Sequence, residues 1–278
     1  MLQKPVADKM PHITWCLTGC LTFLPIHAAG FYGGMDQPKI FDYVVSSYTP
    51  TLTALLSAKH LDARPRNIPR LLAVSQPEAP MQISLPGTSR EVNVIHALQD
   101  QTRRLRVVAL NGEEATVEAV LRCMRDCEWI HIACHGIQDP VKPTNSSFLI
   151  NGQLTLNDIM NQSFSHADLA VLSACQTAKG DSELPEEAIH LAAGMLMAGY
   201  GSVVGTMWSI RDDYAPIVAE KFYTYLVAEA GGDSTKAAYA LHDAVGCLRN
   251  SGDGCGFDRW VPFIHLGTCS LPEPSASP

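Results

Sequence analysis

The sequence predicts an α/β fold built on a mostly parallel sheet that is flanked by helices. From residue 68 onward, apolar runs of strand length alternate with longer stretches of helical period, the pattern of strands joined by crossover helices. The composition is that of a globular protein, with 46% hydrophobic and 17% charged residues in a chain of 278. A chain of this length buries roughly three quarters of the surface that its unfolded form exposes, so it needs no disulfide or metal to hold a core.

Strands are predicted where a short apolar run is bounded by turn or charged residues. Between these runs, apolar residues recur three and four positions apart, which indicates helices; Val117, Val120, Leu121 and Met124 are one such set. The predicted strands are 70–74, 105–110, 129–133, 169–172, 202–208 and 260–266, and the predicted helices are 91–98, 115–124, 185–197, 214–229 and 234–248.

A β-hairpin is predicted inside this alternation. Asn151 and Gly152 stand between the apolar segments 148–150 and 153–156, and Asn-Gly is the strongest short-range signal for a two-residue hairpin turn. We expect this hairpin to be an insertion at the edge of the sheet.

The first part of the chain, 12–66, is predicted to form an extra layer on the same sheet. Its segments 13–24 and 42–48 look extended, and 51–59 looks helical. The core of the fold is then expected at 67–270. It is followed by a flexible tail at 271–278 that is rich in proline and serine.

Charge, hydropathy and cysteine usage argue against a nucleic-acid partner and a membrane span, and they indicate a reducing compartment. The net charge is −8, and the densest basic group is Arg103, Arg104 and Arg106, so no nucleic-acid partner is expected. The apolar stretch 188–210 is broken by glycines and a histidine, and no membrane span is expected. Nine cysteines, an odd number spread through the chain, indicate reduced thiols and a cytoplasmic location.

A histidine and a cysteine follow two of the predicted strands. The run 129–134 stops at His135 and Gly136, and the run 169–174 stops at Cys175. In an open α/β sheet, functional groups collect where strands end at their carboxyl edge, so His135 and Cys175 are expected to face each other.

Such a pair is suited to nucleophilic acyl transfer. The thiolate is the attacking form of cysteine, and a nearby imidazole takes its proton and later protonates the leaving amine. The backbone N–H groups of Gly136 and Cys175 are the expected oxyanion hole. From spacing alone, a buried core cysteine is the simpler interpretation of Cys175.

Several segments resemble the CHAT domain, a branch of caspase-like cysteine peptidases related to separases. They are WIHIACHG (129–136), ADLAVLSACQTAKGDSE (167–183) and AAGMLMAGYGSVVGTMWSIRDD (192–213), together with GCLTFLPIHAAGFYG (19–33), DYVVSSYTPTLTAL (42–55) and RWVPFIHLG (259–267). The resemblance covers nearly the whole chain. It implies a caspase-like fold, a dyad of His135 and Cys175, and an endopeptidase acting on a protein or peptide substrate without a cofactor.

The chain also departs from these families. Gln176 and Thr177 follow the cysteine, where caspases carry a basic residue and glycine, so a caspase preference for aspartate is not carried over. Cys20 stands where CHAT domains usually have proline. CHAT domains are often joined to TPR repeats; none is found here, and TPR or other domains of a longer chain are the expected additional partners.

The segment after the predicted strand 202–208 is the expected substrate pocket. Trp208, Ser209, Asp212 and Asp213 would lie beside the nucleophile strand, and an acid there would favour a basic or long unbranched residue before the scissile bond. In separase-like relatives an acid near this position helps form such a pocket. The alternative, that the two acids cap a helix N-terminus, has equal weight.

Two other functions are alternatives to the peptidase: a zinc site and an interaction module. His131, Cys134 and His135 suggest zinc, but a strand alternates its faces and no second ligand pair follows, so no metal is expected and His131 is expected to be a hydrogen-bonded histidine inside the sheet. The main rival function is a non-catalytic interaction or regulatory module of a larger signalling protein. That module would keep the fold without the activity.

Overall fold

The computed structural model describes residues 10–33, 37–58, 68–139, 141–176, 188–250 and 256–269, and the predicted tail 271–278 lies outside them. The described strands form one sheet in the order β1-β2-β10-β9-β8-β5-β3-β4, with β6 attached to β5 and β7 to β6. The strands are β1 (His12–Trp15), β2 (Val45–Tyr48), β3 (Arg70–Ser75), β4 (Arg106–Asn111), β5 (Trp129–Ile137), β6 (Ser147–Ile150), β7 (Gly152–Thr155), β8 (Leu169–Gln176), β9 (Ser202–Thr206) and β10 (Phe263–Gly267).

Helices connect most of these strands. The α-helices are α1 (Leu52–Ala58), α2 (Pro86–Thr102), α3 (Val117–Asp126), α4 (Leu156–Met160), α5 (Ala188–Met197), α6 (Ala215–Thr224), α7 (Ala237–Asn250) and α8 (Phe257–Trp260). Single turns of 3-10 helix include η2 (Gly19–Phe23), η3 (Ile26–Ala28) and η4 (Ile40–Asp42), and α6 continues into a π-helical turn, η8 (Tyr225–Glu229).

The sheet is mostly parallel, as the alternation of strands and helices predicts. Strand β5 pairs in parallel with β3 and β8, and β8 pairs in parallel with β9. Strand β10 is antiparallel to β9. The fold class predicted from the sequence is therefore confirmed.

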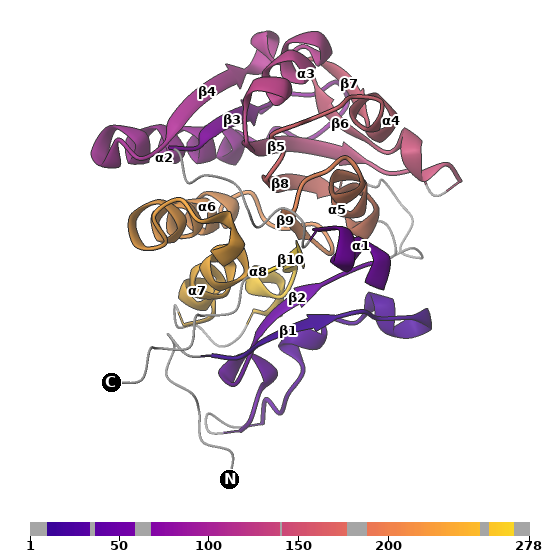
Figure 1. The fold of residues 1–278 in the computed structure, drawn as a ribbon, viewed down its shortest axis with the longest axis vertical. Helices are drawn as coiled ribbons and strands as arrows, with labels where there is room; N and C mark the ends of the chain where they lie inside the picture. Colours follow the sequence, from indigo (N-terminus) through magenta and orange to yellow (C-terminus); the bar gives the residue numbers. More distant parts are fainter. Residues whose placement is uncertain are drawn as a thin grey trace.

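Each face of the sheet carries its own hydrophobic core, because side chains alternate along every strand. Trp129 of β5 and Val171 of β8 pack with α2, α6 and α7 in one core. Ile130 and Leu172, the next residues of the same strands, pack with α3, α4 and α5 in the other. Figure 1 shows the two groups of helices on opposite sides of the sheet. Odd-numbered residues of β5 and β8 thus face α2 and α6.

The predicted hairpin is present and changes the length of β5. Strands β6 and β7 pair on either side of Asn151, with Ile150 opposite Gly152, so Gly152, at a φ of +120°, belongs to β7 and not to the predicted two-residue turn. Strand β6 pairs with the carboxyl end of β5, from His135 to Ile137, and does not lie at the outer edge of the sheet. The predicted end of β5, at residues 133–134, was too early, because β8 pairs with β5 as far as Gly136 and β6 pairs with it from His135 to Ile137.

The N-terminal segment adds strands β1 and β2 to the sheet through β10. The prediction that 13–24 is extended fails beyond Trp15, because Gly19 adopts a φ of +59° and opens the turn η2. Residues 260–262 of the last predicted strand likewise belong to the end of α8 and a turn. Strand boundaries shifted by such local turns leave the topology unchanged.

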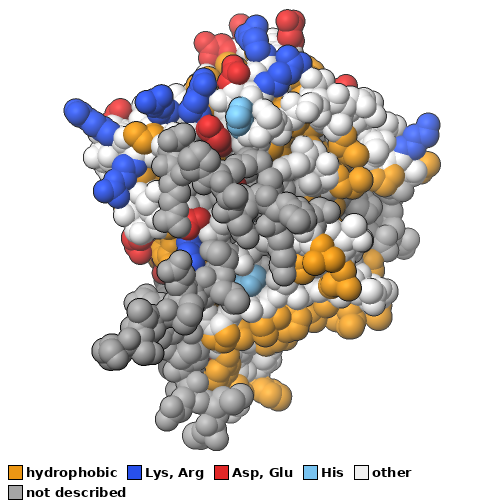
Figure 2. Space-filling view, in the orientation of Figure 1, with side chains coloured by type: hydrophobic (Ala, Val, Ile, Leu, Met, Phe, Trp, Pro, Cys, Tyr) orange, Lys and Arg blue, Asp and Glu red, His pale blue; other side chains and the backbone are white. Residues whose placement is uncertain are grey.

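One face of the molecule is divided between charged and apolar regions. Figure 2 shows acidic and basic side chains gathered at the top of this face and apolar side chains in its lower part. Exposed apolar side chains of the N-terminal segment include Leu21, Leu24, Phe31, Leu52 and Leu56. In the described parts of the chain, no helix combines the length and the apolar character needed to span a membrane.

Candidate functional site

His135 and Cys175 are partners in the register of the parallel pair β5 and β8. The same register pairs Trp129 with Leu169 at the other end, so the two strands run side by side along the whole length of β8. The side chain of Cys175 lies outside the described part of the structure. The backbone places both residues at the carboxyl ends of adjacent central strands, and we call them the register pair.

The imidazole of His135 is buried and held in one tautomer. Its Nε2 lies 2.7 Å from the backbone carbonyl oxygen of Ile83. Because a carbonyl oxygen only accepts hydrogen bonds, Nε2 carries the proton, and Nδ1 is the basic nitrogen of the neutral ring. Nδ1 is buried and has no hydrogen-bond partner among the described residues. Nδ1 of His135 is therefore a proton acceptor that no residue in the described part of the chain occupies.

The carbonyl of Ile83 belongs to the loop between β3 and α2. The loop is closed at its base by a 2.8 Å hydrogen bond from the backbone N–H of Leu85 to the carbonyl of Pro77. The side chains of Met81 and Ile83 are 90% and 79% exposed. The loop thus directs one backbone carbonyl at His135 while its apolar side chains face outward.

Gly136 follows His135 within β5. It pairs with Phe148 of β6 on one side and with Gln176 of β8 on the other. The predicted oxyanion donors, the N–H groups of Gly136 and Cys175, therefore lie on adjacent strands one residue apart in register.

The predicted pocket residues follow β9, which lies next to β8 as expected. Oδ2 of Asp212 accepts a 2.6 Å hydrogen bond from the backbone N–H of Gly87, at the start of α2. Arg90 Nη2 lies 2.9 Å from Oδ1 of Asp213 and 3.6 Å from Oδ2 of Asp212. Both acids thus interact with the first turns of α2.

Two other features describe the pocket segment. The hydrogen bond from Arg90 holds the pKa of Asp213 below its usual value. Trp208 is partly buried and packs against the cores on both faces of the sheet, and Ser209 follows it directly. The aromatic ring anchors the start of this segment, and the acids anchor its end.

His131 lies inside the sheet, as predicted. It is fully buried, its Nδ1 is 3.2 Å from the hydroxyl of Tyr223, and its Nε2 is 3.1 Å from Oε2 of Glu91. Cys134 points into the core on the opposite face, so it does not join the two histidines. Among the residues that the structure describes, no group of three or more histidine, cysteine or acidic side chains is arranged to hold a metal ion.

Two features of this region were not found from the sequence. The carbonyl of Ile83 is a backbone group, so no residue type marks it. Glu91 did carry a signal: it shares a helical face with Ile95 and Leu98, and an acid on an apolar face is unusual.

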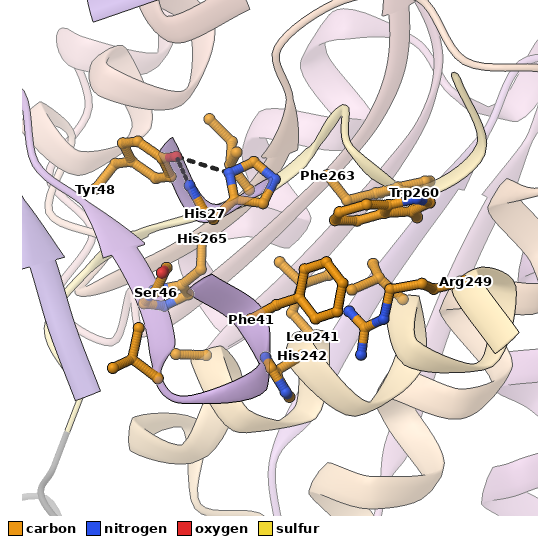
Figure 3. Close-up of a pocket in the computed structure, with 14 residues that line it drawn as sticks. His27, Phe41, Ser46, Tyr48, Leu241, His242, Arg249, Trp260, Phe263 and His265 are labelled. Atoms are coloured by element: carbon orange, nitrogen blue, oxygen red, sulfur yellow. Dashed lines mark hydrogen bonds between the residues drawn. The ribbon is translucent and has the colours of Figure 1, made fainter. Parts of the chain in front are cut away.

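A separate cavity lies between β2, β10 and α7. It is lined in part by His27, Tyr48, His242, Arg249 and Trp260 (Figure 3). The guanidinium of Arg249 lies 3.8 Å from the centre of the Phe41 ring, and burial lowers its pKa. The residues that line this cavity belong to neither β5 nor β8, so it is distinct from the register pair.

The comparisons with known proteins agree on the kind of fold. The family model described as the CHAT domain matches residues 1–268. Among solved structures, the Arg-specific cysteine proteinase gingipain R (RGPB) has a TM-score of 0.56 at 10% identity, covering 83% of this chain and 56% of that one. A complex of the Porphyromonas gingivalis RgpB pro- and mature domains gives 0.58 at 9% identity, covering 83% and 57%.

A separase has a similar structure. In the Saccharomyces cerevisiae separase–securin complex at 2.6 Å, the TM-score is 0.53 at 13% identity, covering 81% of this chain and 14% of that one. The comparison with curated proteins found no match. At these identities the likeness establishes a caspase-like peptidase fold. The chain spans little more than half of the gingipain chain and a small part of the separase chain.

Proposed function

Since the chain belongs to the CHAT domain family, we propose that it is a caspase-like cysteine endopeptidase that cleaves protein substrates in the cytoplasm. His135 and Cys175 form the catalytic dyad. The observation that carries this proposal is the direct pairing of the two residues in the β5–β8 register. Residues paired across neighbouring strands share a face of the sheet, so the backbone register supports a dyad of these two residues.

The tautomer of His135 supports the role of general base. Nδ1 takes the proton of the Cys175 thiol, and the thiolate sulfur attacks the scissile carbonyl carbon. The N–H groups of Gly136 and Cys175 stabilise the negative oxygen of the tetrahedral intermediate, each contributing about 3 kcal/mol. Nδ1 then protonates the leaving amine, and a water molecule hydrolyses the acyl-enzyme to release the acid and restore the thiol.

The Ile83 carbonyl supports the same assignment. It accepts a hydrogen bond from Nε2–H. The proton therefore stays on Nε2, and Nδ1 stays available as the base. When the ring becomes an imidazolium, the same carbonyl faces a positive charge, which strengthens the hydrogen bond. A backbone group therefore does the work of the orienting acid in other nucleophile–base pairs.

We further propose that Trp208, Ser209, Asp212 and Asp213 form the pocket for the residue before the scissile bond, and that a basic or long unbranched residue binds there. The position of β9 beside β8 supports this proposal. Arg90 already neutralises part of the acidic charge. A substrate lysine or arginine must therefore share the acids with it.

One observation favours a second candidate, a non-catalytic interaction module within a larger protein. His135 is 0% exposed, and its ring contacts the Ile83 loop, which a substrate must approach. In this case the fold is retained for docking to other domains, such as TPR repeats.

A peptide-library cleavage assay distinguishes the two candidates. The purified chain is expected to cleave a defined subset of peptides, and Cys175→Ala and His135→Ala are expected to abolish cleavage with the fold unchanged by circular dichroism. Cys134→Ala is the matched control, because this neighbouring thiol faces the opposite core and should leave turnover intact. Cleavage that survives in Cys175→Ala removes the dyad, and a wild-type chain that cleaves nothing supports the interaction module.

A further inference from the structure

A buried carboxylate lies on the same face of the sheet as His135. Glu91 of α2 is 2% exposed, and its Oε1 accepts a 3.0 Å hydrogen bond from the hydroxyl of Ser173 on β8. Its Oε2 lies 3.1 Å from Nε2 of the fully buried His131 on β5, a contact that is close but not aligned as a hydrogen bond. A buried carboxylate is costly unless neighbouring groups compensate it, so this cluster requires an explanation.

Tyr223 of α6 completes the cluster. Its hydroxyl is 3.2 Å from Nδ1 of His131. Burial, together with the negative charge of Glu91, raises the pKa of Tyr223 well above its usual value, so the hydroxyl keeps its proton and donates it to Nδ1. Nε2 then carries the single proton of the neutral ring and lies toward Glu91. The cluster therefore connects α6, β5, α2 and β8.

The position of these residues relates the cluster to the register pair. His131 precedes His135 by four residues on β5, and Ser173 precedes Cys175 by two residues on β8. Two residues of strand span about 7 Å. Glu91 is therefore linked to both strands just below the ends that carry the dyad.

Besides its contacts with β5 and β8, Glu91 is connected to the register pair through its own helix, α2. This helix begins at Pro86, three residues after Ile83, whose carbonyl holds the ring of His135. Asp212 fixes the N-terminus of α2 through Gly87, and Glu91 fixes the following turn against the sheet. The position of the Ile83 carbonyl therefore depends on how α2 is seated.

We propose that Glu91 is a positioning residue of the peptidase, whose buried carboxylate seats α2 against β5 and β8 and so sets the geometry of the Ile83 carbonyl, His135 and Cys175. This inference rests on the proposed function. Glu91 touches neither the substrate nor the dyad. Its effect is on the distance and orientation of groups that react, to which rates are sensitive.

Four variants test the inference. Glu91→Ala removes the carboxylate, and Ser173→Ala removes only its link to β8. Glu91→Gln keeps an oxygen that accepts the hydrogen bond from Ser173. Its amide N–H donates to Nε2 of His131 when the ring proton sits on Nδ1, and Nδ1–H then donates to the Tyr223 hydroxyl. Val92→Ala is the matched control: this neighbouring core residue of α2 is 2% exposed, and its truncation lowers stability without touching the cluster.

Two readouts are measured on folded protein: kcat and KM on a cleaved peptide, and the rate at which iodoacetamide alkylates Cys175. We expect Glu91→Ala to lower kcat by about 100-fold, Ser173→Ala by about tenfold, and both to slow alkylation of Cys175 while KM changes little. Glu91→Gln is expected to recover most of the loss. Val92→Ala is expected to lower the melting temperature with kcat and alkylation near the wild-type values.

The two readouts separate this inference from the proposed function. If the wild-type chain cleaves no peptide, the peptidase fails, and the alkylation rates still decide whether Glu91 positions Cys175. Equal losses in Glu91→Ala and Val92→Ala, by kcat or by alkylation, overturn the inference. Should Glu91→Ala not fold, Ser173→Ala and Glu91→Gln carry the test, and wild-type rates in Ser173→Ala overturn it. If Cys175 reacts no faster in the wild type than in His135→Ala, no dyad exists to be positioned.

Discussion

The backbone N–H of Gly87 donates a 2.6 Å hydrogen bond to Oδ2 of Asp212, although 125 residues separate them in the sequence. The bond satisfies one of the amide groups that the first turn of every helix leaves without an intrahelical partner. It also joins the start of α2 to the segment that follows β9. The two segments that flank the register pair are therefore held together by one carboxylate.

Asp212→Ala is expected to lower the free energy of unfolding by about 1 kcal/mol, because the N-terminus of α2 loses its capping carboxylate. Asp212→Asn keeps an oxygen for Gly87 and removes only the charge, so it should retain most of the stability. Urea unfolding of both variants measures the difference. Equal losses would show that the hydrogen bond to Gly87 contributes nothing.

The same Asp212→Asn variant tests the pocket. If a carboxylate binds a basic residue before the scissile bond, cleavage after lysine and arginine should fall relative to other residues, by about tenfold or more. Asp213→Asn tests the second acid of the pocket, and a smaller fall is expected there because Arg90 Nη2 lies 2.9 Å from Oδ1 of Asp213. A cleavage profile that is dominated by aspartate, or that is unchanged in Asp212→Asn, rules this pocket out.

Gly87→Ala is expected to destabilise the protein, against the usual trend. Alanine within a helix is normally more favourable than glycine, by about 1 kcal/mol. At position 87, however, a Cβ atom would clash with the backbone oxygen of Asp212, so α2 must shift. Gly205→Ala is the control, because its Cβ would meet only the Cβ of Ala192 at 3.7 Å. Thermal unfolding should show a large loss for the first variant alone, and a stabilised Gly87→Ala contradicts the observed packing.

Brief alkylation at neutral pH is expected to modify Cys175 faster than the other thiols. Burial raises the pKa of Cys127 to about 11 and that of Cys269 to about 12, so both remain protonated and resist iodoacetamide. Cys16, Cys20 and Cys247 are exposed and should react after Cys175. Peptide mapping by mass spectrometry measures the order. Modification of these three while Cys175 stays intact contradicts the dyad.

Acid is expected to destabilise the protein through His265. This ring is buried between the hydroxyls of Ser47 and Ser202, at 2.6 and 2.7 Å, and burial lowers its pKa from 6.5 to about 3. Between pH 6.5 and about pH 3, the unfolded chain therefore has this histidine protonated while the folded chain has it neutral. The contribution of neutral His265 to stability is fully present above pH 6.5 and is lost as the pH falls through this window.

The expected size of the His265 effect is about 2 kcal/mol between pH 7 and pH 5. His12 and His27, whose pKa values burial lowers to about 4, act in the same direction. Denaturant titrations of the wild type and of His265→Gln at both pH values measure it. The variant should lose about 2 kcal/mol of the pH dependence, and an unchanged dependence removes His265 as its source.

The sequence predicts the topology well because hydrophobic period and strand length are local properties. The strands 70–74 and 129–133 lie within β3 and β5, and the hairpin is present where it was expected, although only Asn151 separates its strands. The end of β5 was wrong because it depends on pairing with β8 and β6, partners that a local pattern does not reveal. The turn at Gly19 was missed because a glycine adopts positive or negative φ with similar ease.

The candidate site was predictable only where residue types carry its chemistry. His135 and Cys175 were singled out because each follows an apolar run in a segment that resembles the CHAT domain, and the register of β5 and β8 pairs their backbones. The carbonyl of Ile83 and the contact of Asp212 with Gly87 involve backbone atoms, which every residue possesses. Such groups are identified by tertiary structure alone.

The order of strands in the sheet has a consequence for biosynthesis. Strand β2 is hydrogen-bonded to β1 and to β10, and β1 pairs with β2 alone among the described strands. Residues 12–48 therefore leave the ribosome before the strands from β3 to β10 but join the sheet only after residues 263–267 have been made. Until then, the chain can complete the strands from β3 to β9 while β1 and β2 remain undocked. Removing β10 would leave the first strands without their place in the sheet, even though no residue near them in the sequence had changed.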